Sequence, residues 1–237
     1  GCDKNLVDSE TLLGRFALKG VQAVNDPSDA DIWILNSCGF IEASRSDSEE
    51  TLQALIEMKE DQILVVFGCW SQEQDALIKE RYPEVDIIAG VGQFDKVVAA
   101  CLGEAAPTAK LVAFPMAGKA EPAQTIIQDP MEVNYSGMIG RPLLTPGHMA
   151  FVKIGEGCNF NCTFCRIPMI RGKQQCRSIA DIELEVRSLV ERGVTEIQLV
   201  SQNTSDFGRE TGETLLDLVR VLNQVDGLKM MRLLYLY

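Results

Sequence analysis

Three cysteines, Cys158, Cys162 and Cys165, are spaced closely enough to bind one metal centre from a short loop. They follow an apolar stretch that is typical of a buried β-strand. A cubane iron–sulfur cluster has four irons, so three thiolates leave one iron without a protein ligand. That iron can bind the amino and carboxylate groups of a small molecule and pass an electron to it. The spacing therefore predicts a cluster that reacts with a bound cofactor.

A structural zinc site is the alternative for these cysteines. Zinc takes four closed ligands, usually from two Cys-x-x-Cys pairs. The only nitrogen that could be the fourth ligand belongs to His148, which is the single histidine of the chain. The spacing of four and three residues favours the iron–sulfur interpretation.

A second set of cysteines, Cys2, Cys38 and Cys69, is dispersed in sequence but shares one local context. Cys38 and Cys69 each follow an expected strand, and Cys2 precedes the first expected helix. The carboxyl ends of parallel strands lie along one edge of a sheet, where such folds place their ligands. We therefore expect the three thiols to converge and to hold a second cluster. The alternative is that they are small buried residues, which is common for cysteine.

Two further cysteines lie outside these sets. Cys101 falls in an apolar helical stretch and is expected to be a core residue. Cys176 falls in a polar stretch after the first motif, and a redox or ligand role is the weaker of its two interpretations.

The elements expected in residues 1–103 alternate between helix and strand. The helices are expected at 9–20, capped by Asp8 or Ser9, and at 43–59, 72–81 and 94–102; the strands are expected at 32–35, 63–67 and 85–88. Continuous apolar strands separated by helices indicate a parallel sheet covered on both faces. This part of the chain is predicted to be an α/β domain of the flavodoxin or Rossmann type.

The rest of the chain divides into a connector and a second α/β region. Residues 104–147 hold six of the nine prolines and show no sustained period, so we expect a partly extended inter-domain connector. From residue 148 the alternation resumes, with strands expected at 150–154, 196–200 and 230–237 and helices at 182–192 and 214–223. Parallel, right-handed winding is expected for 148–237. Because the chain opens on Gly1-Cys2 and ends on an apolar strand, we expect it to be part of a longer protein.

Composition and charge limit the functional classes. Hydrophobic residues make up 46% and charged residues 24% of the chain, as in ordinary globular proteins. No apolar run approaches the length of a membrane span, and no signal segment opens the chain, so eight cysteines point to metal binding or catalysis in the cytoplasm. A formal net charge of −12 disfavours non-specific nucleic-acid binding and favours a basic partner.

The chain resembles the methylthiotransferases of the radical S-adenosylmethionine (SAM) superfamily in six segments: residues 1–10, 36–41, 68–69, 153–158, 167–172 and 233–237. The resemblance covers nearly the whole chain apart from the connector. It implies the first half of a radical SAM partial barrel in residues 148–237. Cys176 and the pair Gln202-Asn203 depart from the usual pattern of the branch that modifies a ribosomal protein.

The resemblance also implies a division of labour among the cysteines. One 4Fe–4S cluster, held by Cys158, Cys162 and Cys165, would cleave SAM, and an auxiliary 4Fe–4S cluster, held by Cys2, Cys38 and Cys69, would carry the sulfur to be inserted. By the same resemblance Phe164 would contact the adenine of SAM through its backbone. We also expect Gln202 to contact SAM. Arg177 and Arg171 are expected to hold the carboxylate of SAM, although loop arginines are more often solvated. Lys153 and Glu156 flank the end of the strand before the cysteines. A structural ion pair and contact with a ligand are equally acceptable roles for these two residues.

The expected reaction adds a methylthio group to the β-carbon of an aspartate in a small-subunit ribosomal protein. A radical cofactor is required because a C–H bond with no acidity cannot be opened by a positioned base. We expect an external electron donor of the flavodoxin or ferredoxin type and a sulfur source as partners, and no membrane. The alternatives are methylthiolation of an isopentenyl-adenosine in transfer RNA and a non-catalytic iron–sulfur module.

Overall fold

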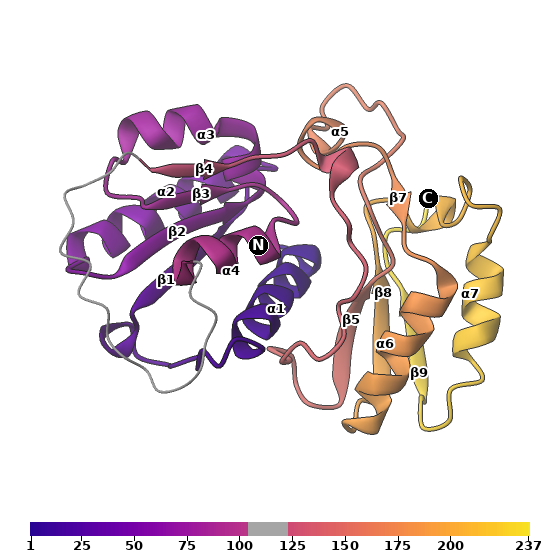
Figure 1. Ribbon diagram of the computed structural model, residues 1–237. Coiled ribbons are helices and arrows are strands. Elements are labelled where there is room, and N and C mark those ends of the chain that lie inside the picture. The colour runs from indigo at the N-terminus through magenta and orange to yellow at the C-terminus, as the bar shows by residue number, and fades with distance from the viewer. Residues whose placement is uncertain (104–122) are drawn as a thin grey trace. The chain divides into compact units, whose positions relative to one another are not determined.

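The computed structural model describes residues 1–103 and 123–237, and it confirms the predicted α/β fold class (Figure 1). The chain divides into two compact units. The first comprises Gly1 and Leu12–Gln128, and the second comprises Cys2–Thr11 and Asp129–Tyr237. The first helix, α1 (Asp3–Ala17), therefore contributes its early turns to the second unit and its last turns to the first.

The first unit contains a parallel sheet with the strand order β1-β2-β3-β4. Its strands are β1 (Ile32–Ser37), β2 (Ile63–Gly68), β3 (Ile87–Ala89) and β4 (Gln124–Ile126). Its further helices are α2 (Glu42–Met58), α3 (Cys69–Arg81), α4 (Phe94–Leu102) and the short 3-10 turn η1 (Pro27–Asp29).

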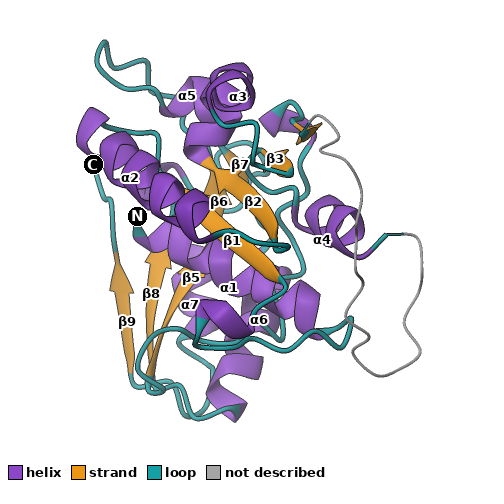
Figure 2. Cartoon of the chain, turned by 90° about the vertical axis from the view of Figure 1, so that its left-hand side faces the viewer, coloured by secondary structure: helices purple, strands orange, loops and turns teal. Residues whose placement is uncertain are grey.

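Alternate residues of the central strand β2 build the two cores of this unit. Leu64 and Val66 pack against the side that holds Leu52 of α2 and Ile78 of α3. The intervening residues of β2 pack on the other side against α4 and the last turns of α1. Figure 2 shows α2 and α4 on opposite sides of the sheet. The continuous apolar run of β2 is therefore explained by burial on both faces.

The second unit contains a parallel sheet with the strand order β5-β8-β9, together with a short antiparallel pair, β6 and β7. Its strands are β5 (Met149–Lys153), β6 (Gly155–Glu156), β7 (Gln175–Cys176), β8 (Glu196–Val200) and β9 (Met230–Leu233). Its helices are α5 (Ile167–Ile170), α6 (Ile179–Glu191) and α7 (Leu215–Leu222), with the 3-10 turns η2 (Pro130–Glu132) and η3 (Thr204–Asp206).

The alternation of β5 assigns its side chains to two different environments. Ala150 and Val152 join the core formed with α6 and α7, which lie along one side of the strands in Figure 1. Phe151 instead packs against a smaller cluster that includes Val7 of α1 and Tyr135. Lys153 follows Phe151 by two residues, so the period of a strand directs it toward the side where α1 lies.

Several expected element boundaries were wrong; for example, the helix expected at 182–192 begins at Ile179, and the strand expected at 85–88 is Ile87–Ala89. The first helix begins at Asp3 rather than at residue 9, since the Leu6 N–H already donates to the Cys2 carbonyl at 3.0 Å, and Asp8 and Ser9 lie inside the helix rather than at its cap. The helix expected to begin at residue 72 begins at Cys69. The last strand ends at Leu233 instead of residue 237, because Tyr235 has a φ of 58°, which a strand cannot accommodate.

The predicted connector contains a strand. Gln124–Ile126 pairs in parallel with β3, so the end of the first unit lies within the stretch expected to link two domains. The part of the connector at residues 104–122 lies outside the described residues. The domain boundaries 1–103, 104–147 and 148–237 stay a prediction.

Candidate metal and cofactor site

The segment that carries Cys158, Cys162 and Cys165 is a loop closed at its base. β6 pairs antiparallel with β7, and the Cys158 N–H donates to the Gly172 carbonyl at 3.1 Å. Gly157 has a φ of +74°, and a Cβ there would lie 2.2 Å from the Lys173 carbonyl oxygen. A glycine is therefore required immediately before Cys158 for the loop to close.

The three cysteines of this loop differ in exposure. Cys158 is buried, Cys165 is half-buried and Cys162 is exposed. The Cys165 N–H donates to the Cys162 carbonyl at 3.0 Å, and the Phe160 N–H points to the Cys158 sulfur at 3.4 Å. Burial, and to a smaller extent the neighbouring cysteine thiols, raises the pKa of Cys158. In its chemistry the donor set fits an iron–sulfur cluster, because all three thiols come from one short loop.

Several buried polar atoms on the segments beside this loop lack a hydrogen-bond partner within the described part of the chain. They are Gln174 Oε1, Gln202 Oε1, Asn203 Oδ1 and Nδ2, and Asp206 Oδ2. Other contacts tie these residues together and to the loop. The backbone N–H of Gln174 donates to Asn159 Oδ1 at 3.2 Å, and the side-chain Nε2 of Gln174 donates to the Asn203 carbonyl at 3.1 Å. Buried polar groups normally have partners, so this arrangement suits a polar ligand.

Gln202, which sequence analysis predicted to contact SAM, follows β8 and is half-buried. Its Nε2 donates to Glu156 Oε2 at 3.2 Å, while its Oε1 is one of the partnerless acceptors. Phe164 lies in the cysteine loop with 82% of its surface exposed, and its side chain is therefore open to solvent. The SAM contacts of both residues stay predictions.

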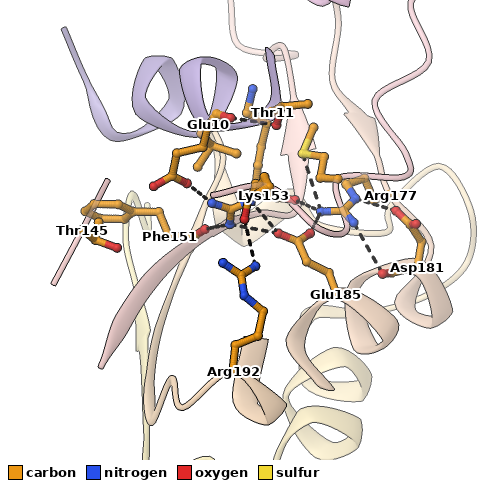
Figure 3. A network of polar contacts seen from close by, with 12 residues as sticks. Glu10, Thr11, Thr145, Phe151, Lys153, Arg177, Asp181, Glu185 and Arg192 are labelled. Atoms are coloured by element: carbon orange, nitrogen blue, oxygen red, sulfur yellow. Dashed lines mark hydrogen bonds and ion pairs between the residues drawn. The ribbon is translucent and has the colours of Figure 1, made fainter. Parts of the chain in front are cut away.

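Arg177 lies in a buried ion network rather than in solvent (Figure 3). Its guanidinium donates to Glu185 at 2.5 Å, to Asp181 at 2.6 Å and to the Lys153 carbonyl at 2.7 Å. Burial would lower the pKa of Arg177, but the Glu185 and Asp181 carboxylates raise it. These contacts favour a structural role, and a contact from Arg177 to SAM stays a prediction.

A second group of buried charges involves Lys153, Glu156 and Arg171, with Asp8 of α1. Lys153 is paired with both Asp8 and Glu156, and Arg171 is paired with the same two carboxylates. Burial alone would raise the pKa of Glu156, but Arg171 and Lys153 lower it to about 2. Sequence analysis missed the role of Asp8. The signal was Lys153, a cation at the end of an apolar strand, which requires a buried anion.

Cys38 and Cys69 follow neighbouring parallel strands at matching positions. Ser37 of β1 is in register with Gly68 of β2. The residue after each of them is a cysteine, so Cys38 and Cys69 follow the two strands at the same level. A Cβ on Gly39 would lie 2.9 Å from the Trp70 Cα, which shows how closely these two strand ends approach. Cys2 belongs to the second unit, and its Sγ contacts Asn5 Oδ1 at 3.3 Å. Convergence of Cys2 with the other two stays a prediction.

The remaining candidates have ordinary environments. Cys101 is half-buried in α4, and burial, with the Asp86 carboxylate, raises the pKa of its thiol to about 12. Cys176 lies in β7, where its sulfur accepts from the Gly208 N–H at 3.3 Å. Within the described residues, no group of three histidine, cysteine, aspartate or glutamate side chains is arranged as a metal site, and none of the helices there could cross a membrane.

Comparison with known proteins finds similarity in both halves of the chain. Residues 1–90 match Uncharacterized protein family UPF0004, and residues 152–228 match the Radical SAM superfamily. The chain is 37% identical over 240 residues to the ribosomal protein uS12 methylthiotransferase RimO of Sulfurovum sp. (strain NBC37-1), and 38% identical over 245 residues to that of Clostridium tetani. The chain therefore resembles radical SAM methylthiotransferases along its whole length. This confirms the resemblance expected from its motifs.

The two cysteine sets fall in different matched regions. Cys158, Cys162 and Cys165 lie in the radical SAM match, and Cys2, Cys38 and Cys69 lie in the UPF0004 match. The RimO of Helicobacter pylori is 37% identical over 241 residues. These relatives match 100% of the chain, whereas the chain spans only 50–51% of their length.

Proposed function

We propose that the protein is a radical SAM methylthiotransferase whose substrate is the ribosomal protein uS12. The single observation that carries the proposal is the closed loop bearing Cys158, Cys162 and Cys165, beside buried polar atoms with no partner among the described residues. Three thiolates and a polar ligand site are what a SAM-cleaving 4Fe–4S cluster needs. The RimO relatives supply the substrate class.

In this proposal Cys158, Cys162 and Cys165 hold the first cluster, and Cys2, Cys38 and Cys69 hold an auxiliary one. When bound, the clusters and SAM supply electron transfer, radical generation and the sulfur to be inserted. Cys162 is exposed and Cys158 is buried, so the three residues would hold the cluster at the edge of the loop. Gln202 Oε1 and the Asn203 side chain accept and donate hydrogen bonds to SAM, and burial of these groups keeps water from the reacting atoms.

The charge of the protein suits a basic protein substrate better than a nucleic acid. The net charge of −12 attracts a basic ribosomal protein at a distance and repels phosphates. Within the proposal, the target atom is the β-carbon of an aspartate of uS12. A small electron-transfer protein of the flavodoxin or ferredoxin type reduces the first cluster, and a separate sulfur source restores the auxiliary cluster.

Iron analysis of anaerobically reconstituted protein tests the assignment of ligands. Two cubanes give about eight irons per chain. Replacing Cys158, Cys162 and Cys165 by alanine removes half of the iron and abolishes SAM cleavage. Replacing Cys2, Cys38 and Cys69 removes the other half and leaves SAM cleavage measurable. Cys101→Ala and Cys176→Ala serve as controls that keep all the iron; full iron in either triple variant contradicts the grouping.

The substrate is tested separately, by incubating reduced enzyme with SAM and either uS12 or transfer RNA. Mass spectrometry of uS12 is expected to show replacement of one hydrogen by a methylthio group on an aspartate. Modification of transfer RNA instead would replace the substrate assignment. Absence of SAM cleavage in fully reconstituted protein would favour the alternative that the protein is a non-catalytic iron–sulfur module.

A further inference from the structure

Four buried charged groups of the second unit form a closed ring, which we call the charge ring: Asp8, Lys153, Glu156 and Arg171. Lys153 Nζ pairs with Asp8 Oδ1 and with Glu156 Oε1. Arg171 Nη1 donates to Glu156 at 2.6 Å and 2.8 Å, and its Nη2 donates to Asp8 Oδ2 at 3.1 Å. Each cation therefore bridges the same two anions, and every member is at most 2% exposed.

The charge ring is bound to both cysteine-bearing segments of this unit. On one side, Arg171 Nη2 donates to Asn5 Oδ1 at 3.1 Å, and the same oxygen lies 3.3 Å from the Cys2 sulfur. On the other side, Glu156 is two residues before Cys158 at the base of the cysteine loop. A continuous chain of polar contacts thus runs from the thiol of Cys2 to the strand that leads into the loop.

The closed geometry makes the ring a rigid link. Two positive and two negative groups balance, so the burial of each charge is compensated only while all four stay in place. Arg171 uses the fixed fork of its guanidinium to reach Asp8, Asn5 and Glu156 together, which a flexible lysine cannot reproduce. The first turns of α1 are therefore held to β5, β6 and α5 by charge pairing as well as by the apolar contact of Val7.

We propose that the charge ring positions Cys2, through Asn5, for its role as an auxiliary-cluster ligand. The inference rests on the proposed function for the role of Cys2, but the positioning itself is a property of the cluster-free protein. Asp8, Asn5 and Arg171 are thus positioning residues, which act on Cys2 and do not contact the reacting atoms. Removing one of them frees the Cys2 segment while the cysteine loop remains closed by its own backbone hydrogen bonds.

The test measures the rate at which N-ethylmaleimide labels Cys2 in reduced, cluster-free protein, by peptide mass spectrometry, with Cys38 as the internal reference. Asp8→Asn is expected to raise the Cys2 rate at least fivefold relative to Cys38. The matched control is Glu10→Gln. It removes a buried carboxylate charge from the same helix, but this carboxylate pairs with Arg141 and not with the charge ring. We expect Glu10→Gln to change the Cys2 rate less than twofold at a similar loss of thermal stability.

Asn5→Ala separates positioning from folding, because it keeps all four ring charges and removes the bridge from Arg171 to Cys2. It is expected to raise Cys2 labelling with little change in the thermal midpoint, and Arg171→Lys to give an intermediate rate. Equal labelling of Cys2 in the wild type, Asp8→Asn and Asn5→Ala overturns the proposal, as does an equal increase in Glu10→Gln. A protein that lacks methylthiotransfer but shows the labelling pattern refutes the proposed function alone.

With reconstituted protein, the same variants give a second readout. Asp8→Asn and Asn5→Ala are expected to lower the amount of methylthio product per SAM cleaved, while Glu10→Gln leaves that ratio unchanged. A purely structural defect would lower product and cleavage together, and that result contradicts the positioning role.

Discussion

Ser37 and Gly68 are paired in register at the carboxyl ends of two adjacent parallel strands, so that Cys38 and Cys69 follow at the same edge of the sheet. This relationship depends on close approach of the two chain segments just beyond the strands. Gly39 makes that approach possible, because a Cβ there would lie 2.9 Å from both the Cα and the N of Trp70. Backbone atoms cannot give way as the end of a side chain can.

Gly39→Ala is therefore expected to destabilise the protein by about 1–3 kcal/mol, the usual cost of overpacking. It should also weaken retention of the iron assigned to Cys38 and Cys69. Urea denaturation and iron analysis measure the two effects. The control is Gly147→Ala, whose added Cβ meets nothing within 4 Å and which should change stability by less than about 0.5 kcal/mol. Equal stability of the two variants would show that the segments separate freely.

Arg141→Met is expected to destabilise the protein by about 3–5 kcal/mol, since it leaves the Glu10 carboxylate buried without its cation. Arg141 also donates to Glu185 at 2.9 Å, and only 2% of its side chain is exposed. Thermal and urea denaturation measure the change.

The matched control for that variant is Arg187→Met, which breaks an exposed arginine–glutamate pair with Glu183 on α6. Exposed pairs contribute about 0–1 kcal/mol, so this variant should be nearly neutral. Similar losses of stability in the two variants would mean that burial does not determine how much the Arg141 pair contributes to stability.

The thiol of Cys101 is expected to resist alkylation well above pH 9. Its ordinary pKa is 9.0, and burial, with the Asp86 charge, raises the folded-state pKa to about 12. Because the folded pKa is the higher one, the contribution of the neutral thiol to stability is complete below pH 9 and is lost as the pH rises toward 12. Alkylation rates of folded and urea-unfolded protein measured against pH check this. Half-maximal labelling of the folded protein at pH 9 would contradict it.

Asn203→Ala is expected to leave stability unchanged or slightly raised while it weakens SAM binding about tenfold. Both polar atoms of the buried Asn203 side chain lack a partner among the described residues, so folding gains little from them. Equilibrium dialysis of SAM with reconstituted protein and thermal denaturation measure the two properties. Gln93→Ala, a buried polar change in the first unit, is the control for binding. A large loss of stability with unchanged affinity would assign Asn203 to the core.

The order of helices and strands followed closely from the sequence, and the exceptions have physical causes. Apolar runs such as Ile63–Gly68 indicate a buried strand directly, because strands covered on both faces need no polar residue. The start of α1 was placed too late, since Lys4 and Asp8 look like surface or capping residues and are in fact buried. The strand Gln124–Ile126 was missed because three residues beside a proline-rich stretch carry no period.

The sequence by itself predicted the first cysteine set, because three cysteines within eight residues need only a short loop to lie together. It also determined the α/β class and the placement of Cys38 and Cys69 after neighbouring strands. Only the tertiary structure decided which charges are buried together. Asp8 meets Lys153 and Arg171 across separations of 145 and 163 residues, and no local pattern specifies such partners. A buried charge is stable only beside a charge of opposite sign, so the chain's distant segments had to be brought together before the roles of these residues became visible.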